Sequence, residues 1–275
     1  MKLLAYLKII RPINVLITFL VVLVAILISQ TGVMEISIYL LVPLSASLIA
    51  AAGNVINDIY DIETDRISHP ERVLVLGNLD IKRAWLLNFL LNTTAVFITL
   101  FISKTLLVIA VLTIVLLYFY STHLQKLPLI GNITVAILTG AAFLYGGVAV
   151  DNISSAIIPA VFAIMINLIR ELVKDTQDME GDLKNGYQTF PIKFGVLNTH
   201  KLIIALSIIL ILMTLYPFFF HIYRIEYFII VMLFVNPLIV YLIKIISSNK
   251  EALPKVSILL KINMIAGLIA IYLGK

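Results

Sequence analysis

Two acidic stretches carry most of the chemistry that this sequence could perform: NDIYDIETD at residues 57–65 and KDTQDMEGD at residues 174–182. The acids of the first stretch recur in the second at one constant spacing, with Asp58, Asp61, Glu63 and Asp65 matching Asp175, Asp178, Glu180 and Asp182. Clustered carboxylates repel one another unless a cation joins them. Oxygen ligands suit Mg²⁺, which takes few protein carboxylates and completes its shell with water and substrate phosphates. The repeat therefore predicts a Mg²⁺ site for a phosphorylated substrate.

Helical spacing places these acids on common faces. Asn57, Asp61 and Asp65 are four residues apart, and Asp178 and Asp182 repeat that spacing, with Asp175 three residues before them. Solvated acidic helix ends are the alternative, but acids at a helix C-terminus oppose the helix dipole. We therefore predict a set of metal ligands: Asn57, Asp58, Asp61, Asp65, Asp175, Asp178 and Asp182.

A metal-bound diphosphate also needs basic partners, because Mg²⁺ alone does not neutralise it. Lys and Arg side chains can stabilise a departing diphosphate electrostatically. Four basic residues close to the acids are the catalytic candidates, although each also fits ordinary membrane-flanking charge: Lys126, Arg72, Lys174 and Arg66. Weaker, substrate-binding candidates are polar or aromatic residues near the ends of apolar runs: Arg11, Asn14, Tyr120, Asn132 and Tyr145.

The elements that must position these residues are membrane helices. Hydrophobic residues make up 61% of the 275 and the mean hydropathy is +1.09, which excludes a soluble domain. A membrane span needs about 20 mostly apolar residues, and the chain has nine such runs: 13–30, 36–57, 84–102, 105–122, 130–149, 153–172, 201–220, 226–246 and 256–273. The first run is too long for a signal peptide and lacks a good cleavage site. We predict one all-α, polytopic domain over residues 1–275.

The basic residues predict the orientation of the spans. With a cytoplasmic N-terminus, all of the 20 Lys and Arg residues except Lys104, Arg224 and Lys275 fall on the cytoplasmic side. This bias explains the net charge of +5 without a nucleic-acid partner. An even number of spans separates the two acidic stretches, so both emerge on the cytoplasmic side. We expect two halves of one site at the surface of the cell membrane.

Several other classes fit less well. A transporter built from inverted repeats would place matched polar sites near the bilayer midplane, and a cation transporter would need charge there, whereas these acids lie at helix ends. A head-group transferase of the CDP-alcohol type would carry Asp-Gly-x-x-Ala-Arg, which does not occur. A diphosphate held at the mouth of an apolar helix bundle favours a polyprenyl diphosphate, with its tail among the helices.

The two acidic stretches resemble the paired aspartate-rich motifs of the UbiA-type intramembrane prenyltransferases, the first of which has the form Asn-Asp-x-x-Asp-x-x-x-Asp. Flanking segments agree, namely RISHPERV, YSTHLQKLPLIGN and RELVKDTQDMEGDLKNGYQTFPIKFG. The resemblance implies nine helices around a central cavity and roles near the diphosphate for Arg72, Lys126 and Lys174. It also implies that Mg²⁺ bridges the diphosphate to Asn57, Asp61, Asp65, Asp178 and Asp182.

Within the family, the second motif and the short chain are similar to members that join a geranylgeranyl group to the free hydroxyl of geranylgeranylglyceryl phosphate in ether-lipid synthesis. Those members continue Arg-Pro-Ile-Pro-Ser-Gly where residues 72–77 here are RVLVLG. The main alternative is an aromatic acceptor of the 4-hydroxybenzoate or naphthoate type, used for quinones. The expected partners are a polyprenyl diphosphate, the acceptor and membrane lipid, with no obligate protein partner.

The topology can be tested directly, because the chain contains no cysteine. Single cysteines introduced at Ser68 and Asn185 should both be labelled by a membrane-impermeant thiol reagent from the cytoplasmic side alone, since the basic residues place both connections there. A cysteine at Ser103 is the matched control and should be labelled from the other side. Labelling of Ser68 and Asn185 variants from opposite sides would contradict a shared site.

Overall fold

The computed structural model describes residues 2–248 and 253–275, so Lys250, one of the basic residues counted above, lies outside the described part. Within these ranges the chain is helical, and nine helices are long and apolar enough to cross a membrane: Pro12–Ser29, Ile36–Tyr60, Ile81–Leu100, Lys104–Thr122, Ile130–Val148, Ser154–Lys184, Val196–Phe219, Ile225–Ser247 and Leu253–Gly274. The prediction of an all-α, polytopic membrane protein is confirmed.

The described chain falls into two compact units. Of the described residues, the N-unit comprises 2–126, 141–157 and 180–187, and the C-unit comprises 127–140, 158–179, 188–248 and 253–275. Two long helices, α7 (Ile130–Val148) and α8 (Ser154–Lys184), contribute turns to both units. The single domain over residues 1–275 stays a prediction.

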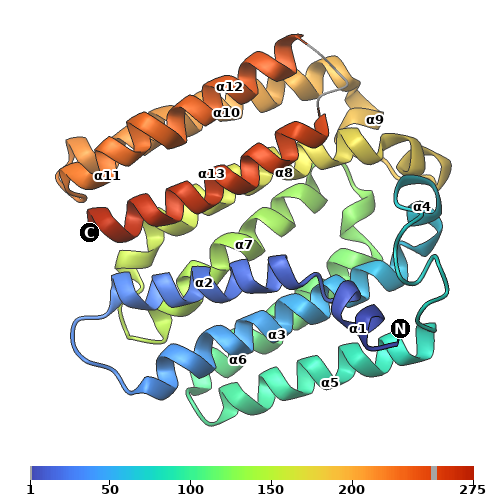
Figure 1. Cartoon of the computed structure of the whole chain (residues 1–275), viewed down its shortest axis with the longest axis horizontal. Helices are drawn as coiled ribbons and strands as arrows, with labels where there is room; N and C mark the ends of the chain where they lie inside the picture. The colour runs from blue at the N-terminus through green and yellow to red at the C-terminus, as the bar shows by residue number, and fades with distance from the viewer. Residues whose placement is uncertain (1, 249–252) are drawn as a thin grey trace. The chain divides into compact units, whose positions relative to one another are not determined.

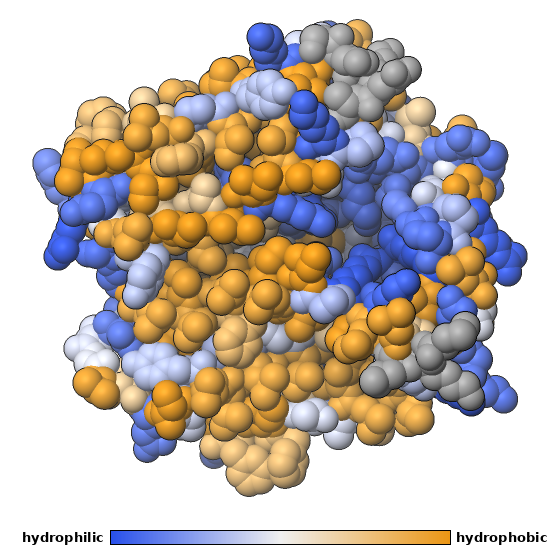
Figure 2. Space-filling model, in the orientation of Figure 1, coloured by the Kyte–Doolittle hydropathy of each residue, from blue (hydrophilic) through white to orange (hydrophobic). Residues whose placement is uncertain are grey.

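The N-unit is built around α3 (Ile36–Tyr60), which packs against α2 (Pro12–Ser29), α5 (Ile81–Leu100) and α6 (Lys104–Thr122). Figure 1 shows these helices side by side. The surface of the N-unit is largely apolar, as lipid requires. Figure 2 shows hydrophobic residues over α2, α3 and α5, whereas hydrophilic residues gather over α4 (Ile62–Ser68). The polar end of the N-unit is therefore the end that carries the first acidic motif.

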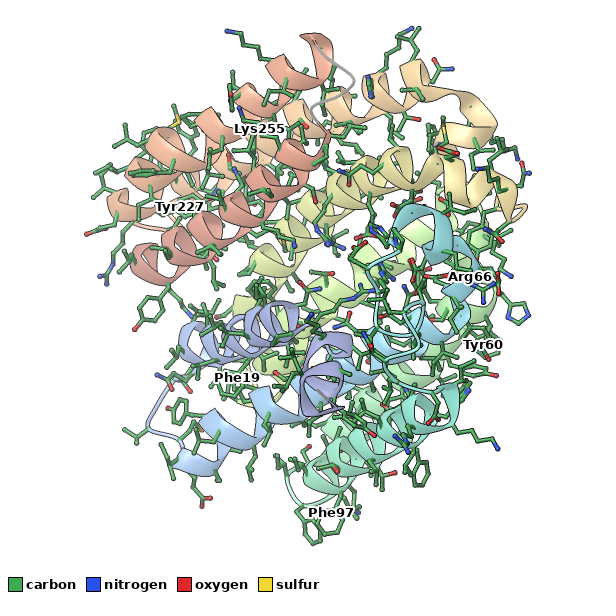
Figure 3. All side chains as sticks on the ribbon, turned by 45° about the vertical axis from the view of Figure 1, so that its right-hand side comes forward. Phe19, Tyr60, Arg66, Phe97, Tyr227 and Lys255 are labelled. Atoms are coloured by element: carbon green, nitrogen blue, oxygen red, sulfur yellow. The ribbon has the colours of Figure 1, made fainter. Side chains whose placement is uncertain are left out.

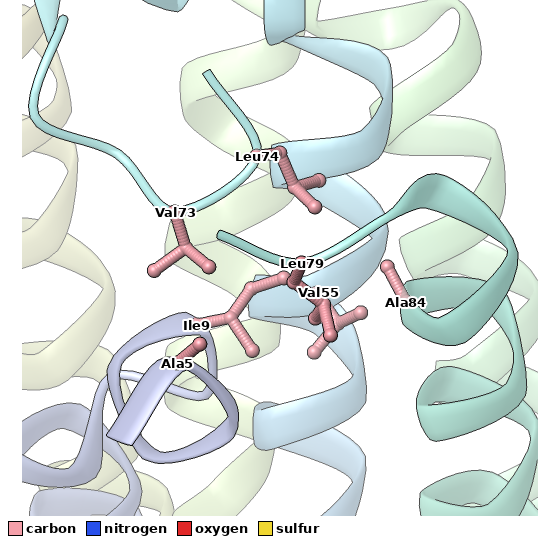
Figure 4. Packing of buried hydrophobic residues seen from close by; sticks show 7 residues of the cluster. All are labelled: Ala5, Ile9, Val55, Val73, Leu74, Leu79 and Ala84. Atoms are coloured by element: carbon pink, nitrogen blue, oxygen red, sulfur yellow. The ribbon is translucent and has the colours of Figure 1, made fainter. Parts of the chain in front are cut away.

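A small hydrophobic cluster anchors the loop that follows α4. Figure 4 shows it: Ala5 and Ile9 of α1 (Lys2–Ile9), Val55 of α3, Val73, Leu74 and Leu79 of the loop, and Ala84 of α5. Gly77 turns the loop with a φ of 67°, a left-handed conformation that glycine adopts without strain. Val73 and Val75 stand where the resembled sequences have proline. Here Val73 and its neighbour Leu74 hold the loop by burial, at 5% and 9% exposure.

The C-unit packs α12 (Asn236–Ser248) against α10 (Val196–Phe219) and α13 (Leu253–Gly274), and α11 (Ile225–Ile230) against the same two helices. Helix α9 (Phe190–Phe194) contacts α10, which follows it. A π-helical segment, η2 (Val231–Val235), interrupts the eighth span. Asn263 Nδ2 donates to the Val235 carbonyl at 2.7 Å, and the hydroxyl of Tyr227, labelled in Figure 3, donates to the Thr214 carbonyl at 2.9 Å. Polar side chains thus satisfy backbone groups where lipid offers no partner.

The contact of α7 with α8 in the C-unit gives a stability test. A Cβ at Gly140 would lie 2.5 Å from Ile164 Cγ1 and 2.8 Å from the Ala160 carbonyl oxygen, whereas a Cβ at Gly267 in α13 would meet nothing within 4 Å. Gly140→Ala should therefore lower stability by about 1–3 kcal/mol through overpacking, seen as a lower Tm in detergent. Gly267→Ala, the matched control, should be neutral or gain up to about 1 kcal/mol from helix propensity. Equal Tm values for the two variants would contradict the close packing.

Candidate active site

The first acidic motif spans the junction of α3 and α4. Asp61 ends α3 with φ −94° and ψ 7°, but the helical hydrogen bonds continue through it: Asp61 N donates to the Asn57 carbonyl at 2.9 Å and Asp65 N to the Asp61 carbonyl at 2.7 Å. The expected spacing of Asn57, Asp61 and Asp65 along one face therefore survives the short break. Helix α4, over which hydrophilic residues gather in Figure 2, follows directly and carries Asp65.

Asn57 and Asp61 form the first pair of the site. Asn57 Nδ2 donates to Asp61 Oδ2 at 2.8 Å, and Gln125 Nε2 donates to Asp61 Oδ1 at 2.7 Å. Asn57 Oδ1 is buried and has no hydrogen-bond partner among the described residues. A buried amide oxygen without a donor is costly, and a hard oxygen of this kind next to a carboxylate is a suitable ligand for Mg²⁺.

Two arginines bind the remaining aspartates of the first motif, Asp58 and Asp65. Arg72 Nη1 lies 2.9 Å from Asp58 Oδ1 and 2.6 Å from Asp65 Oδ2, and Arg11 forms a second ion pair with Asp58. The side chains of both aspartates are 5% exposed. Buried carboxylates of this kind require such partners, because an unpaired buried charge is strongly unfavourable. Coordination of a metal by Asp58 and Asp65 stays a prediction.

The backbone at Arg11 is strained in a way that serves this contact. Arg11 lies in the left-handed region, with φ 55° and ψ 72°, directly before Pro12, a conformation that costs on the order of 1–3 kcal/mol for a residue other than glycine. Asn54 Nδ2 donates to the Ile10 carbonyl at 2.9 Å and holds this break between α1 and α2 against α3. The strained turn directs the Arg11 guanidinium to Asp58.

The electrostatics of Asp65 reflect its surroundings. Burial raises the pKa of Asp65 to about 6, the Arg72 guanidinium opposes this rise, and the neighbouring Asp61 and Asp58 charges add to it. At neutral pH Asp65 is therefore ionised and paired with Arg72. Burial, followed by the Asp61 charge, also raises the pKa of Tyr187 to about 12, so its hydroxyl remains a hydrogen-bond donor.

Two residues that the sequence analysis missed, Gln125 and Tyr187, complete this half of the site. Tyr187 follows α8, and its hydroxyl lies 3.4 Å both from Asp61 Oδ1 and from Gln125 Nε2. Lys126 Nζ stands over the Tyr187 ring, 5.3 Å from its centre, a cation–π contact. Tyr187 therefore places the predicted catalytic lysine and the predicted metal ligand Asp61 around one ring. Both missed residues lie inside quoted flanking segments, but their loop positions carry no periodicity.

The last turn of α8 packs closely on α4 within the N-unit. A Cβ at Gly181 would lie 2.3 Å from Ser68 Oγ and 3.1 Å from the Thr64 carbonyl oxygen. Asp182, the last acid of the second motif, is 7% exposed here, and its carbonyl accepts from Tyr187 N at 2.9 Å. The absent side chain at Gly181 lets this turn approach the helix of the first motif.

The rest of the second motif belongs to the C-unit, where α8 carries Lys174, Asp175 and Asp178. Asn132 Nδ2, from the start of α7, donates to Asp175 Oδ2 at 2.8 Å. The structure thus joins Asn132, a predicted substrate-binding residue, to a predicted metal ligand. Among the described residues no group of three or more His, Asp or Glu side chains is already arranged to hold a metal ion, but the donors are all oxygen atoms, as Mg²⁺ requires.

The other predicted residues have different surroundings. Arg66 is exposed and pairs with Glu63 at 2.9 Å, and Figure 3 shows it on α4, in a solvated ion pair of the kind that contributes little. Tyr145 is buried, with its hydroxyl 2.8 Å from Ser45 Oγ of α3, in a contact between helices. Asn14 and Tyr120 are half-buried on α2 and α6. Substrate roles for these residues stay predictions.

An aromatic group lies beside the site on the outer surface of the N-unit. Tyr60, labelled in Figure 3 at the end of α3, contacts the rings of Trp85 and Tyr118 edge-on, with centroid distances of 6.1 and 6.2 Å. All three rings are partly exposed. Tyr and Trp favour the boundary between lipid and water, so this group marks the level at which the first motif leaves the membrane. Phe97, near the other end of α5, belongs to a separate exposed pair with Phe101.

Known proteins of one family resemble this chain over most of its length. The UbiA prenyltransferase family matches residues 16–265, so the chain belongs to that family and is a membrane prenyltransferase. It is similar to the digeranylgeranylglyceryl phosphate synthase of Methanosphaera stadtmanae, with 32% identity over 271 residues and 98% of each chain covered.

Solved structures extend the comparison. One, on the biosynthesis of digeranylgeranylglyceryl phosphate synthase in membranes, has a TM-score of 0.78 and 35% identity, and the match covers 99% of this chain and 98% of that one. A UbiA homologue from Archaeoglobus fulgidus bound to DMAPP and Mg²⁺ has a TM-score of 0.69 at 22% identity, covering 97% and 98% of the two chains. The second shows the shared fold.

Tyr187 gives a test of this half of the site. Tyr187→Phe keeps the ring beneath Lys126 and removes the hydroxyl near Asp61, so prenyl transfer should fall by a few-fold, as expected for one long hydrogen bond of about 0.5 kcal/mol. Tyr187→Leu removes both contacts and should cost at least about tenfold. Tyr118→Phe is the control, because its hydroxyl meets the exposed Tyr60 hydroxyl at 3.3 Å. A Tyr187→Leu enzyme with the wild-type kcat would show that the ring does not position Lys126.

Proposed function

We propose that this enzyme transfers a geranylgeranyl group from its diphosphate to the free hydroxyl of geranylgeranylglyceryl phosphate in ether-lipid synthesis. The observation that carries the proposal is the end-to-end similarity to digeranylgeranylglyceryl phosphate synthases. The loop at residues 72–77 differs from that of the resembled sequences, but this difference does not contradict the proposal. Val73 and Leu74 hold the loop by burial, and Arg72 keeps its contacts with Asp58 and Asp65. Prenylation of an aromatic acceptor is the alternative within the family.

We propose that both motifs supply ligands to Mg²⁺: Asn57, Asp61 and Asp65 from the first, and Asp175, Asp178 and Asp182 from the second. The unpaired Asn57 Oδ1 beside Asp61 supports this, as does a donor set without sulfur or a histidine cluster. The related A. fulgidus protein was solved with DMAPP and Mg²⁺. When bound, Mg²⁺ would neutralise diphosphate oxygens and so stabilise the charge that develops on the leaving group.

The basic residues have complementary roles in this proposal. Arg72 and Arg11, held by Asp58, present their remaining N–H groups to the diphosphate, while Lys126 over the Tyr187 ring and Lys174 on α8 add positive charge. As the allylic C–O bond breaks, its electron pair stays on the diphosphate, and these cations stabilise that charge. The acceptor oxygen then forms the new C–O bond. Asp58 thus positions two arginines in addition to any contact with the metal.

The location of the reaction is also proposed. The basic residues flanking the spans support an N-terminus and active-site loops on the cytoplasmic face of the cell membrane. The water-soluble diphosphate would leave on that side, while the prenyl tails remain in lipid.

A product assay tests the acceptor. Purified protein is incubated with geranylgeranyl diphosphate, Mg²⁺ and, in separate reactions, geranylgeranylglyceryl phosphate, 4-hydroxybenzoate or a hydroxynaphthoate, and the products are identified by mass. The proposal predicts that the ether lipid is formed with the highest kcat/KM. A prenylated aromatic product, with no ether lipid formed, would contradict it.

The metal ligands can be tested by substitution and chelation. Asp61→Ala and Asp178→Ala should each reduce turnover at least about a thousandfold, because the loss of one ligand weakens metal binding and leaves the diphosphate unneutralised. Glu63→Ala is the control, since that carboxylate is exposed and pairs with Arg66. EDTA should abolish turnover, and excess Mg²⁺ should restore it. Full activity in EDTA would contradict metal dependence.

A further inference from the structure

Helix α8 carries a second polar group one turn before the second motif. Asn167, Glu171 and Asp175 are four residues apart and share one face of the helix. Glu171 lies about 6 Å from Asp175 along the axis, toward the apolar part of the span. An ionised acid in this position is energetically costly unless it is paired. Carboxylates inside a membrane span are therefore usually paired and usually functional.

The contacts of this group are defined. Arg170 Nη1 lies 2.7 Å from Glu171 Oε1 and 3.4 Å from Asn167 Oδ1. The Glu171 side chain is 6% exposed and stands next to the fully buried Leu172. Asn167 is 3% exposed, and its Nδ2 has no hydrogen-bond partner among the described residues.

One carboxylate acceptor and one unpaired amide donor therefore lie in the same buried group. Leaving Nδ2 unpaired in apolar surroundings costs roughly 1–3 kcal/mol, which a ligand could recover. A hydroxyl matches this pair, because it donates one hydrogen bond and accepts another. A phosphate matches it poorly, since the Glu171 carboxylate would repel it.

The first motif has no counterpart to this acid. The position three residues before Lys174 in the second motif is Glu171, and the equivalent position before Asn57 is Asn54. Asn54 is neutral and already donates to the Ile10 carbonyl. The second motif is thus preceded by an acid, Glu171, that the first motif lacks. Glu171 lies one helical turn before Asp175, the first of the proposed metal ligands in the second motif.

We infer that Asn167 and Glu171 bind the hydroxyl group of the acceptor and that Glu171 takes its proton, an inference that rests on the function proposed above. Asn167 Nδ2 donates to the hydroxyl oxygen, and the hydroxyl donates to Glu171. As that oxygen forms its bond to the allylic carbon, the O–H bond breaks and the proton passes to Glu171. The electron pair of the broken C–O bond leaves with the diphosphate, so charge and atoms balance.

This assignment fits the chemistry of the neighbouring acids. Carboxylates bound to Mg²⁺ are poor bases, whereas Glu171 lies outside the proposed metal ligands and pairs with Arg170, which orients it. General base catalysis contributes about 10²–10⁴-fold. Arg170 acts through Glu171 and is a positioning residue.

The test separates proton transfer from cleavage of the diphosphate. Purified wild-type and Glu171→Gln enzymes receive geranylgeranyl diphosphate, Mg²⁺ and geranylgeranylglyceryl phosphate, and ether lipid, prenol and released diphosphate are quantified in single turnovers. Glu171→Gln should form ether at least about 100-fold more slowly, while diphosphate release stays within about threefold of the wild type and prenol increases. Glu180→Gln is the control, because that exposed acid on the same helix pairs with Lys184.

Asn167→Leu supplies an independent arm of similar side-chain volume. It should raise the KM for the acceptor about tenfold, as expected for one lost hydrogen bond to a buried donor, with the KM for geranylgeranyl diphosphate unchanged. The inference is overturned if Glu171→Gln forms ether at the wild-type rate, if its diphosphate release falls in parallel with ether formation, or if Asn167→Leu leaves the acceptor KM unchanged. Failure of the wild-type enzyme to alkylate this acceptor would instead overturn the proposed function, and this inference with it.

Discussion

Arg72 lies between Asp58 and Asp65, and the geometry of the first motif depends on this bridge. Three aspartates at one buried helix end repel one another, and the guanidinium offsets that repulsion with two charge-assisted hydrogen bonds. Removing one partner of a buried pair typically costs about 3–5 kcal/mol, because the other charge is left unpaired. The bridge also fixes the loop after α4 to α3.

The hydrophobic cluster of Figure 4 supports the same bridge by holding the residues that follow Arg72. Val73 and Leu74 follow Arg72 directly and are buried against α1 and α3, so the loop cannot move without exposing them. The turn between α1 and α2 is joined to α3 by the Arg11–Asp58 pair and by the hydrogen bond from Asn54 to the Ile10 carbonyl. Packing and charge therefore hold the same few residues in place. The site is thus in a defined arrangement before its highly charged substrate binds.

A membrane interior makes unpaired polar groups expensive, and most buried amides of the described chain obey that constraint. Asn88 donates to the Ala52 carbonyl, Asn263 to the Val235 carbonyl and Asn132 to Asp175 Oδ2. Among the described residues, the buried side-chain amides with an unpaired atom are Asn57 and Asn167. Each lies beside a carboxylate of α3 or α8 for which a ligand is proposed. Exceptions to the rule thus coincide with sites that a substrate or metal would complete.

The sequence predicted the spans and the motif faces because hydropathy and a spacing of four residues are local properties. It could not predict that Arg72 bridges two acids, that Asn132 bonds to Asp175, or that Gln125 and Tyr187 surround Asp61, because those contacts join segments without any periodic pattern. The loop at residues 72–77 departs from the resembled sequences, and only its packing shows how valine and leucine hold it in place. Arg66 and Arg72 look equivalent in the sequence. The structure shows that Arg66 forms an exposed ion pair, whereas Arg72 bridges two buried aspartates.

The proposed Mg²⁺ site requires both acidic motifs to bind one metal-bound diphosphate. The most direct measurement is a structure of the enzyme with Mn²⁺ and an unreactive geranylgeranyl thiodiphosphate, in which anomalous scattering locates the metal. The account predicts an anomalous peak bound by carboxylate oxygens of both motifs, among them Asp61 and Asp178, and by the diphosphate. A metal bound by one motif alone, or a diphosphate bound without metal, would contradict it.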